Sequence, residues 1–189
     1  MRSTRDHLPI PFKKGKDMRR TLGKNRTGFT LVEVLIVVVI LGILAATVLP
    51  QFTAASDDAK ESSLRQNLQL LRGQIQMYKF QHDSIFPGAT STEVADKLTK
   101  ASKVDGTTAA PGTAGYAYGP YVVGQMPPNP FNGGRGIKVV TGSVAGVVVD
   151  EAALDGTEKV GWIYSKDLGE VKANTAGMAG DGVTPFDKL

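Results

Sequence analysis

The sequence predicts an α+β fold in which a long N-terminal α-helix packs on a small antiparallel β-sheet. An apolar run from Phe29 to Leu49, whose one acid is Glu33 near its start, suits a membrane-spanning helix, and apolar residues then repeat at helical spacing from Leu64 to Tyr78. Short alternating segments separated by glycine turns fill the C-terminal third. We therefore expect three parts: a basic leader (residues 1–28), an apolar helix (29–50) and a globular domain (51–189).

The leader is strongly basic. It holds nine Lys or Arg residues against Asp6 and Asp17, a net +7 that leaves −3 for residues 29–189. A basic segment before an apolar run is typically retained in the cytoplasm by the positive-inside bias. A nucleic-acid-binding arm is the alternative, but it would not need the apolar run, so we expect no nucleic acid partner. The chain has no Cys, which excludes disulfides, thiolate metal sites and cysteine nucleophiles.

The apolar run is long enough to cross a membrane as a helix. At ~1.5 Å per residue it spans roughly 31 Å, close to the ~30 Å hydrocarbon core of a bilayer. The β-branched cluster Val37 to Ile40 would also suit a strand, but strands seldom exceed about 10 residues. A cleaved secretory signal, with small residues at Thr53 and Ala55, is the other alternative. The run is longer than a usual signal core and contains an acid, Glu33, near its start, which disfavours that alternative.

Glu33 is the unusual residue of this segment. An unpaired carboxylate costs about 2.5–3.5 kcal/mol at the centre of a bilayer and less near its surface. Glu33 therefore either has a partner or reaches back to the headgroups.

The stretch Gly28-Phe29-Thr30-Leu31-Val32-Glu33, followed by an apolar helix, resembles the processing site of type IV prepilins and of the pseudopilins of type II secretion systems. The resemblance implies a pilin-like fold and cleavage between Gly28 and Phe29 by a membrane aspartyl peptidase, which also N-methylates Phe29. Glu33 matches the family's acid at the fifth mature position. Gly42 and Pro50 fall at positions where many members of the family have a helix-loosening glycine and a proline. Thr27 departs from the pattern, since a basic residue is common there, and Arg26 lies one step further back.

The resemblance also implies a location and partners. The chain would be a single-pass protein of a bacterial inner membrane, with its leader in the cytoplasm and its globular domain in the periplasm. Its partners would be the prepilin peptidase, other pseudopilins, an inner-membrane secretion assembly platform and further copies of itself in a filament. In that filament, the α-amine of Phe29 would pair with Glu33 of a neighbour and set the register, because a buried charge is tolerated only when paired. Translation from Met18 instead of Met1 would give a shorter basic leader.

The second half of the helix is amphipathic and is predicted to end near His82. One face carries Leu64, Leu68, Leu71, Ile75 and Tyr78, which we expect to pack on the protein's own sheet rather than to form a coiled-coil seam.

Two features of the sequence speak against a continuous helix. Pro50 costs roughly 3 kcal/mol inside an ordinary helix, and Asp58 with Glu61 has the spacing of a new helix start. We expect a continuous but kinked helix that is weakest between Gly42 and Pro50.

Beyond the helix, Thr90 and Glu93 have capping-box spacing at the start of a short helix in "TSTEVADKLTKA". The Gly/Thr/Ala-rich stretch "DGTTAAPGTAG" is predicted to be a loop, and prolines at 127–130 fix an extended, turned segment. Strands are predicted at 136–140, 145–150, 159–165 and 170–174, with Trp162, Ile163 or Tyr164 facing the helix according to register. The Pro-rich turn and the absence of cysteine resemble the major pseudopilins of the protein G type more than disulfide-closed pilins.

No catalytic constellation is evident in the sequence, so we do not expect an enzyme. His82 is predicted to be a solvated helix cap, and "NGGRG" at 132–136 an ordinary turn. No cofactor is expected other than calcium, which major pseudopilins often bind through a C-terminal acidic loop. The candidate ligands are Asp150, Glu151, Asp155 and Asp181, although none lies in a D-x-D-x-D loop and solvated turn acids are the default.

These features predict a structural subunit of a type II secretion pseudopilus. The alternatives are a type IV pilin of a surface fibre, which would serve adhesion, motility or DNA uptake, and a membrane-anchored binding or enzymatic domain.

Overall fold

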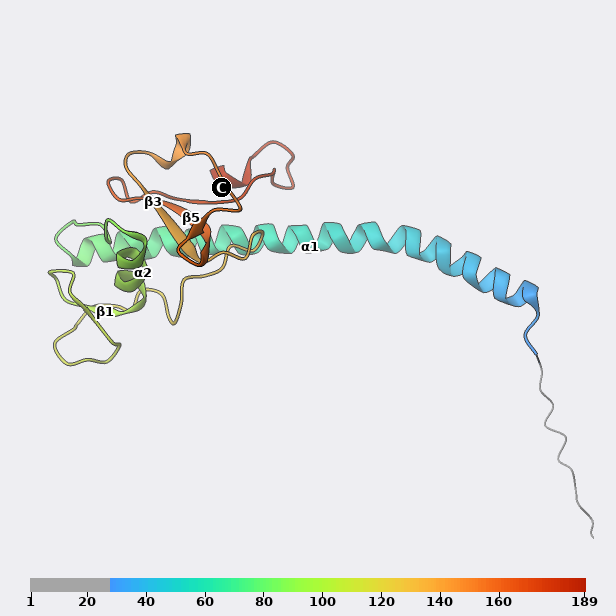
Figure 1. Cartoon of the computed structure of the whole chain (residues 1–189), viewed down its shortest axis with the longest axis horizontal. Coiled ribbons are helices and arrows are strands. Elements are labelled where there is room, and N and C mark those ends of the chain that lie inside the picture. Colours follow the sequence, from blue (N-terminus) through green and yellow to red (C-terminus); the bar gives the residue numbers. More distant parts are fainter. Residues whose placement is uncertain (1–27) are drawn as a thin grey trace, which may run out of the picture. The chain divides into compact units, whose positions relative to one another are not determined.

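The computed structural model describes residues 28–189, so the leader predicted at 1–28 lies outside the described residues except for Gly28. The chain divides into two units, the first ending at Ala45 and the second covering Ala46–Leu189. Figure 1 shows the elements in order. The helices are α1 (Leu31–Gln81) and α2 (Ser91–Thr99), with 3-10 turns η1 (Val144–Gly146) and η2 (Phe186–Lys188). The strands are β1 (Ala101–Ser102), β2 (Thr108–Ala109), β3 (Gly136–Val140), β4 (Leu154–Asp155), β5 (Glu158–Ser165) and β6 (Val171–Ala173). The predicted α+β class is confirmed.

Helix α1 is a single helix of 51 residues. It continues through residue 50 and through Asp58, so the capping-box spacing of Asp58 and Glu61 does not start a new helix. Glu61 instead accepts hydrogen bonds from Arg65 and from the Gly180 N–H. The continuity of the helix is confirmed, and its weakness between Gly42 and Pro50 stays a prediction.

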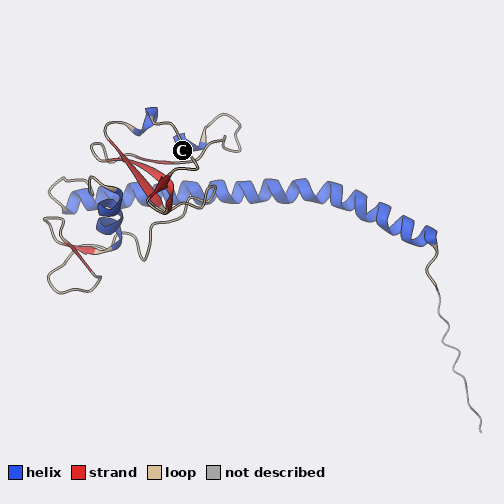
Figure 2. Ribbon diagram, in the orientation of Figure 1, coloured by secondary structure: helices blue, strands red, loops and turns tan. Residues whose placement is uncertain are grey.

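The C-terminal part of α1 supplies one side of the hydrophobic core. The predicted stripe of Leu64, Leu68, Leu71, Ile75 and Tyr78 is buried, with at most 2% of any of these side chains exposed. The sheet supplies the other side, and Figure 2 shows the strands gathered over this part of α1. The prediction that the stripe packs on the protein's own sheet is confirmed.

The main sheet is mixed rather than purely antiparallel. β3 pairs with β5 in parallel, while β4 and β6 pair with β5 antiparallel. Residues 141–157 form the crossover that parallel pairing requires, and they include η1 and the short strand β4. The antiparallel expectation was therefore wrong for β3.

The prediction of a strand at residues 145–150 was also wrong. Residues 144–146 form η1, and the segment after it is held by side chains instead of a strand ladder. Lys172 Nζ donates to the Val147 carbonyl over 2.7 Å, and Asn174 Oδ1 accepts from the Asp150 N–H over 2.8 Å. These bonds satisfy the backbone that a strand partner would otherwise pair.

Register decides which residues of β5 face α1. Trp162 is paired with Ile137 and Ala173, and Tyr164 with Val139 and Val171, and both aromatic rings join the core cluster. Ile163 is fully buried but lies outside that cluster, because successive side chains of a strand point to opposite faces.

The region between α1 and β3 follows the prediction with one exception. The Thr90 hydroxyl caps α2 by accepting from the Glu93 N–H, as predicted. Residues 126–129 of the Pro-rich segment form neither helix nor strand, and the Pro127 carbonyl accepts a 2.8 Å hydrogen bond from the Trp162 indole. The stretch predicted to be a loop contains β2, which pairs with β1.

Candidate assembly and processing site

The described residues around the predicted scissile bond, 28–30, are exposed to solvent. Gly28, Phe29 and Thr30 precede α1 in no regular secondary structure, and 86% of Phe29 is exposed. A Cβ placed on Gly28 would meet no atom within 4 Å. This geometry leaves the Gly28–Phe29 peptide bond accessible to a peptidase.

Glu33 lies in the first turn of α1 and is paired within its own chain. Its Oε2 atom accepts hydrogen bonds from the Thr30 N–H over 2.8 Å and from the Thr30 hydroxyl over 2.9 Å. In return, the Glu33 N–H donates to Thr30 Oγ over 3.2 Å. This reciprocal pair is a capping box, which satisfies backbone donors at a helix start. The prediction from sequence missed it, although the Thr-x-x-Glu spacing that predicted the cap of α2 is also present at Thr30 and Glu33.

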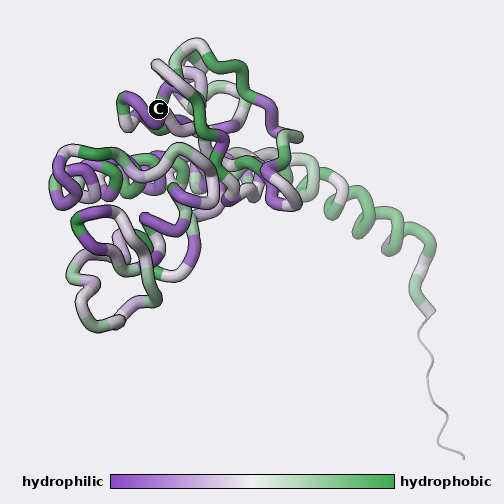
Figure 3. Tube along the Cα trace, turned by 60° about the vertical axis from the view of Figure 1, so that its left-hand side comes forward, coloured by the Kyte–Doolittle hydropathy of each residue, from purple (hydrophilic) through white to green (hydrophobic). Residues whose placement is uncertain are grey.

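The segment that follows is apolar on every side. Each large apolar side chain from Leu31 to Leu49 is at least 41% exposed, and Figure 3 shows this stretch in the hydrophobic colour. It belongs to a helix long and apolar enough to cross a membrane. Gly42 lies inside it with open space where a side chain would be. Such a surface requires lipid or other protein to cover it.

The four acids predicted as candidate calcium ligands each accept hydrogen bonds from other residues of the chain. Asp150 accepts from the Ala152 N–H, and Asp155 accepts from the Ser91 hydroxyl. Glu151 accepts from the Thr175 hydroxyl over 2.7 Å and from the Ala176 N–H over 2.6 Å, and these bonds lower its pKa. Hydrogen bonds from the Thr184 hydroxyl, the Thr184 N–H and the Val183 N–H lower the pKa of Asp181 to about 2.

Among residues 28–189, no three His, Cys, Asp or Glu side chains come together as a metal-binding group. Calcium binding by Asp150, Glu151, Asp155 or Asp181 therefore stays a prediction. A calcium-dependent rise in the melting temperature of the full chain would check it.

His82 is buried, so its prediction as a solvated cap was wrong. Only 1% of it is exposed, and its ring stacks on Tyr78 with the centroids 3.8 Å apart. Nδ1 donates to the Tyr78 carbonyl over 2.8 Å, because a carbonyl can only accept, and Nε2 lies 3.0 Å from the Ser102 hydroxyl. His82 therefore ties the end of α1 to β1.

An accessible glycine before an aromatic residue, a capped acid and an exposed apolar helix that continues into a globular α+β domain define a membrane-anchored, pilin-like subunit. The family described as "Prokaryotic N-terminal methylation motif" matches residues 23–49. Six of the similar proteins are named type II secretion system core protein G. The Aeromonas hydrophila protein is 32% identical over 57% of this chain and 69% of its own length, and the Klebsiella pneumoniae protein 31% identical over 57% and 71%. The Pseudomonas aeruginosa protein is 43% identical over 30% of this chain. The chain belongs to the family of type II secretion system core protein G.

The matched segments differ in extent. The match spans only 39% of the Pseudomonas protein. No solved structure matches the chain.

Proposed function

We propose that the chain is a structural subunit of a type II secretion pseudopilus, processed by a prepilin peptidase and assembled into a periplasmic filament that serves protein secretion. The single observation that carries this proposal is the sequence from Gly28 to Glu33, which leads directly into the first part of α1, where every large apolar side chain from Leu31 to Leu49 is at least 41% exposed. The names of the relatives favour secretion over the alternative, a surface-fibre pilin.

The proposed location follows from the same features. The chain is a single-pass protein of the bacterial inner membrane, with the basic leader in the cytoplasm and residues 51–189 in the periplasm. It acts by assembly, not by catalysis, with further copies of itself, other pseudopilins and the inner-membrane assembly platform as partners.

Glu33 sets the register in this proposal. In the lone chain its carboxylate is held by Thr30, and in the filament it pairs with the N-methylated α-amine of Phe29 from a neighbouring copy. A paired charge is tolerated in a low-dielectric helix bundle, whereas an unpaired one is strongly destabilising.

Replacement of Glu33 by Ala tests the proposal. We expect Glu33→Ala to be cleaved at a near-normal rate and to give at least about tenfold less filament, because loss of a buried charge partner costs about 3–5 kcal/mol. Sedimented filaments and secreted substrate are measured in the same cells. Glu93→Ala is the matched control, since Glu93 is the equivalent acid at the start of α2. A normal filament yield from Glu33→Ala contradicts the proposal.

A further inference from the structure

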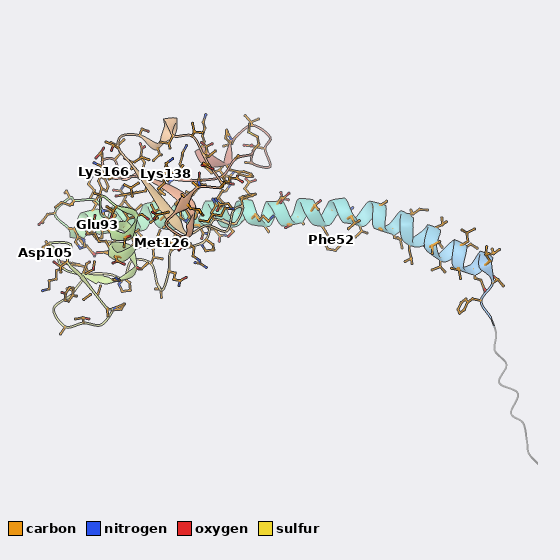
Figure 4. The ribbon with its side chains drawn as sticks, in the orientation of Figure 1. Phe52, Glu93, Asp105, Met126, Lys138 and Lys166 are labelled. Carbon is orange, nitrogen blue, oxygen red and sulfur yellow. The ribbon has the colours of Figure 1, made fainter. Side chains whose placement is uncertain are left out.

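Two lysines lie in one row across the main sheet but differ in exposure. Lys138 of β3 and Lys172 of β6 are both paired with Ile163 of β5. Because cross-strand partners point to the same face of a sheet, both lysines share the face of Ile163. Trp162 and Tyr164, which join the core with α1, occupy the opposite face. Lys138, labelled in Figure 4, is exposed, whereas only 3% of Lys172 is exposed.

The buried ammonium of Lys172 has two oxygen partners. Its Nζ atom donates to the Val147 carbonyl over 2.7 Å and to Oδ2 of Asp187 over 3.0 Å. Such partners are required, because an unpaired charge inside a protein is strongly destabilising. In every other ion pair described within residues 28–189, the side chain of the cation is at least 37% exposed. Lys172 is therefore a cation built into the fold rather than a surface charge.

The partners of Lys172 belong to two segments that are not strands of the main sheet. Val147 directly follows η1 in the crossover, and Asp187 lies in η2. The crossover is held further along by Asn174, whose amide accepts from the Asp150 N–H and donates to the Asp150 carbonyl. Side-chain bonds thus replace a strand ladder here, and the Lys172 ammonium joins the crossover and η2 to β6.

The same segments contain most of the acids predicted as calcium ligands. Asp150 and Glu151 lie in the crossover, and Asp181 lies between β6 and η2. Calcium takes about six to eight oxygen ligands that converge on one point. These acids instead accept hydrogen bonds from separate neighbours, and no three acids come together within residues 28–189. As they lie, they do not fit a calcium site.

We infer that the Lys172 ammonium takes the structural place that the resemblance gives to a calcium ion in this domain. It binds the kinds of ligand that calcium takes, a backbone carbonyl and a carboxylate. It is also a covalent part of β6, so a chelator cannot remove it. The stability of the globular domain is then independent of calcium. This role does not depend on assembly into a filament, so it and the proposed function can fail separately.

Thermal unfolding of the full chain in detergent, with excess calcium or with a chelator, tests this role. We expect the wild type to melt within about 1 °C in the two conditions, because only a bound ligand stabilises the folded state. Lys172→Met should melt at least about 5 °C lower in both, because it leaves the Asp187 carboxylate and the Val147 carbonyl without their partner. Lys138→Met is the matched control from the same row, and it should stay within about 2 °C of the wild type.

A double-mutant cycle tests whether Lys172 acts through Asp187. Asp187→Asn alone should lower the melting temperature, because it leaves a buried ammonium without its counter-charge. The same change should have little further effect in Lys172→Met, since two residues that act as a pair do not contribute additively. If Lys172→Met does not fold, a lower melting temperature for Asp187→Asn than for Asp83→Asn, a change at an exposed acid, supports the pairing instead.

Three results would overturn the inference. The first is equal melting of Lys172→Met and Lys138→Met, and the second is full additivity of the two changes at Lys172 and Asp187. The third is a rise of several degrees in the melting temperature of the wild type with calcium, which would confirm the calcium prediction in its place.

Discussion

At the scale of single residues, the best-defined feature is the pair of Thr30 and Glu33. The Glu33 carboxylate is already paired in the lone chain, because the N–H and hydroxyl of Thr30 both donate hydrogen bonds to it. The capping box therefore reduces the cost of placing Glu33 near lipid before assembly, and it holds the carboxylate one turn from the new chain end that cleavage would create.

Thr30→Val tests this role of the hydroxyl. The variant keeps the side-chain shape and the Thr30 N–H, but it loses the hydroxyl bonds with Glu33 and should destabilise the helix start by about 1 kcal/mol. We expect normal cleavage with a several-fold lower filament yield, measured by sedimentation. Thr90→Val, the same change at the cap of α2, is the control and should leave the yield unchanged. Equal effects of the two variants would contradict a special role for Thr30.

Asp181 predicts an acid-sensitive loop. Its pKa is lowered from 3.8 to about 2, first by the Thr184 hydroxyl and then by backbone N–H groups. A lowered pKa in the folded state means that the stabilisation is present above the unfolded pKa and is lost as the pH falls toward the folded value. We expect Asp181→Asn to melt below the wild type at pH 6 and the difference to shrink between pH 4 and 2, as measured on the full chain in detergent. Asp83→Asn, at another exposed acid, is the control, and a difference that persists at pH 2 would contradict the account.

At the scale of elements, periodic local patterns predicted the structure well. The spacing of the apolar residues predicted the buried stripe of α1, and Thr90 with Glu93 predicted the cap of α2. The strands β3 and β5 begin and end within a residue of their predicted bounds. These elements were predictable because each depends on side chains close in sequence.

Features that depend on distant partners were not predictable. The parallel pairing of β3 depends on how the crossover packs, and the burial of His82 depends on Ser102, 20 residues away. The segment at 147–150 has a strand-like pattern, but Lys172 and Asn174 satisfy its backbone. In the candidate site, the resemblance located Glu33 but not its partner Thr30, although the Thr-x-x-Glu spacing of a capping box is present there in the sequence.

The turn between β5 and β6 docks on the segment after α1 through Gly169. This glycine has a φ of +67°, and a Cβ there would overlap the ring of Phe86. We expect Gly169→Ala to cost about 1 kcal/mol for the backbone conformation and a further 1–3 kcal/mol for the overlap. Gly142→Ala is the matched control, because Gly142 has a φ of +73° with open space around it. Thermal unfolding of both variants checks this, and equal losses of stability would contradict the packing role of Gly169.

At the scale of the whole molecule, one helix joins an exposed apolar segment to a domain with its own core. The globular domain buries only one side of its part of α1. We therefore infer that the chain folds as a subunit whose exposed apolar surface is covered by lipid before assembly and by other copies of the chain afterwards. Cleavage at Gly28 would be the step that commits it to assembly, because it creates the α-amine that Glu33 is proposed to bind.

The intact mass of the mature chain, purified from cells that contain the prepilin peptidase, tests this account most directly. We expect a chain that begins with N-methylated Phe29 and ends at Leu189. A chain that begins at Ser56 would instead show ordinary secretion by a signal peptidase. That mass, or the mass of the uncleaved chain, would contradict the account.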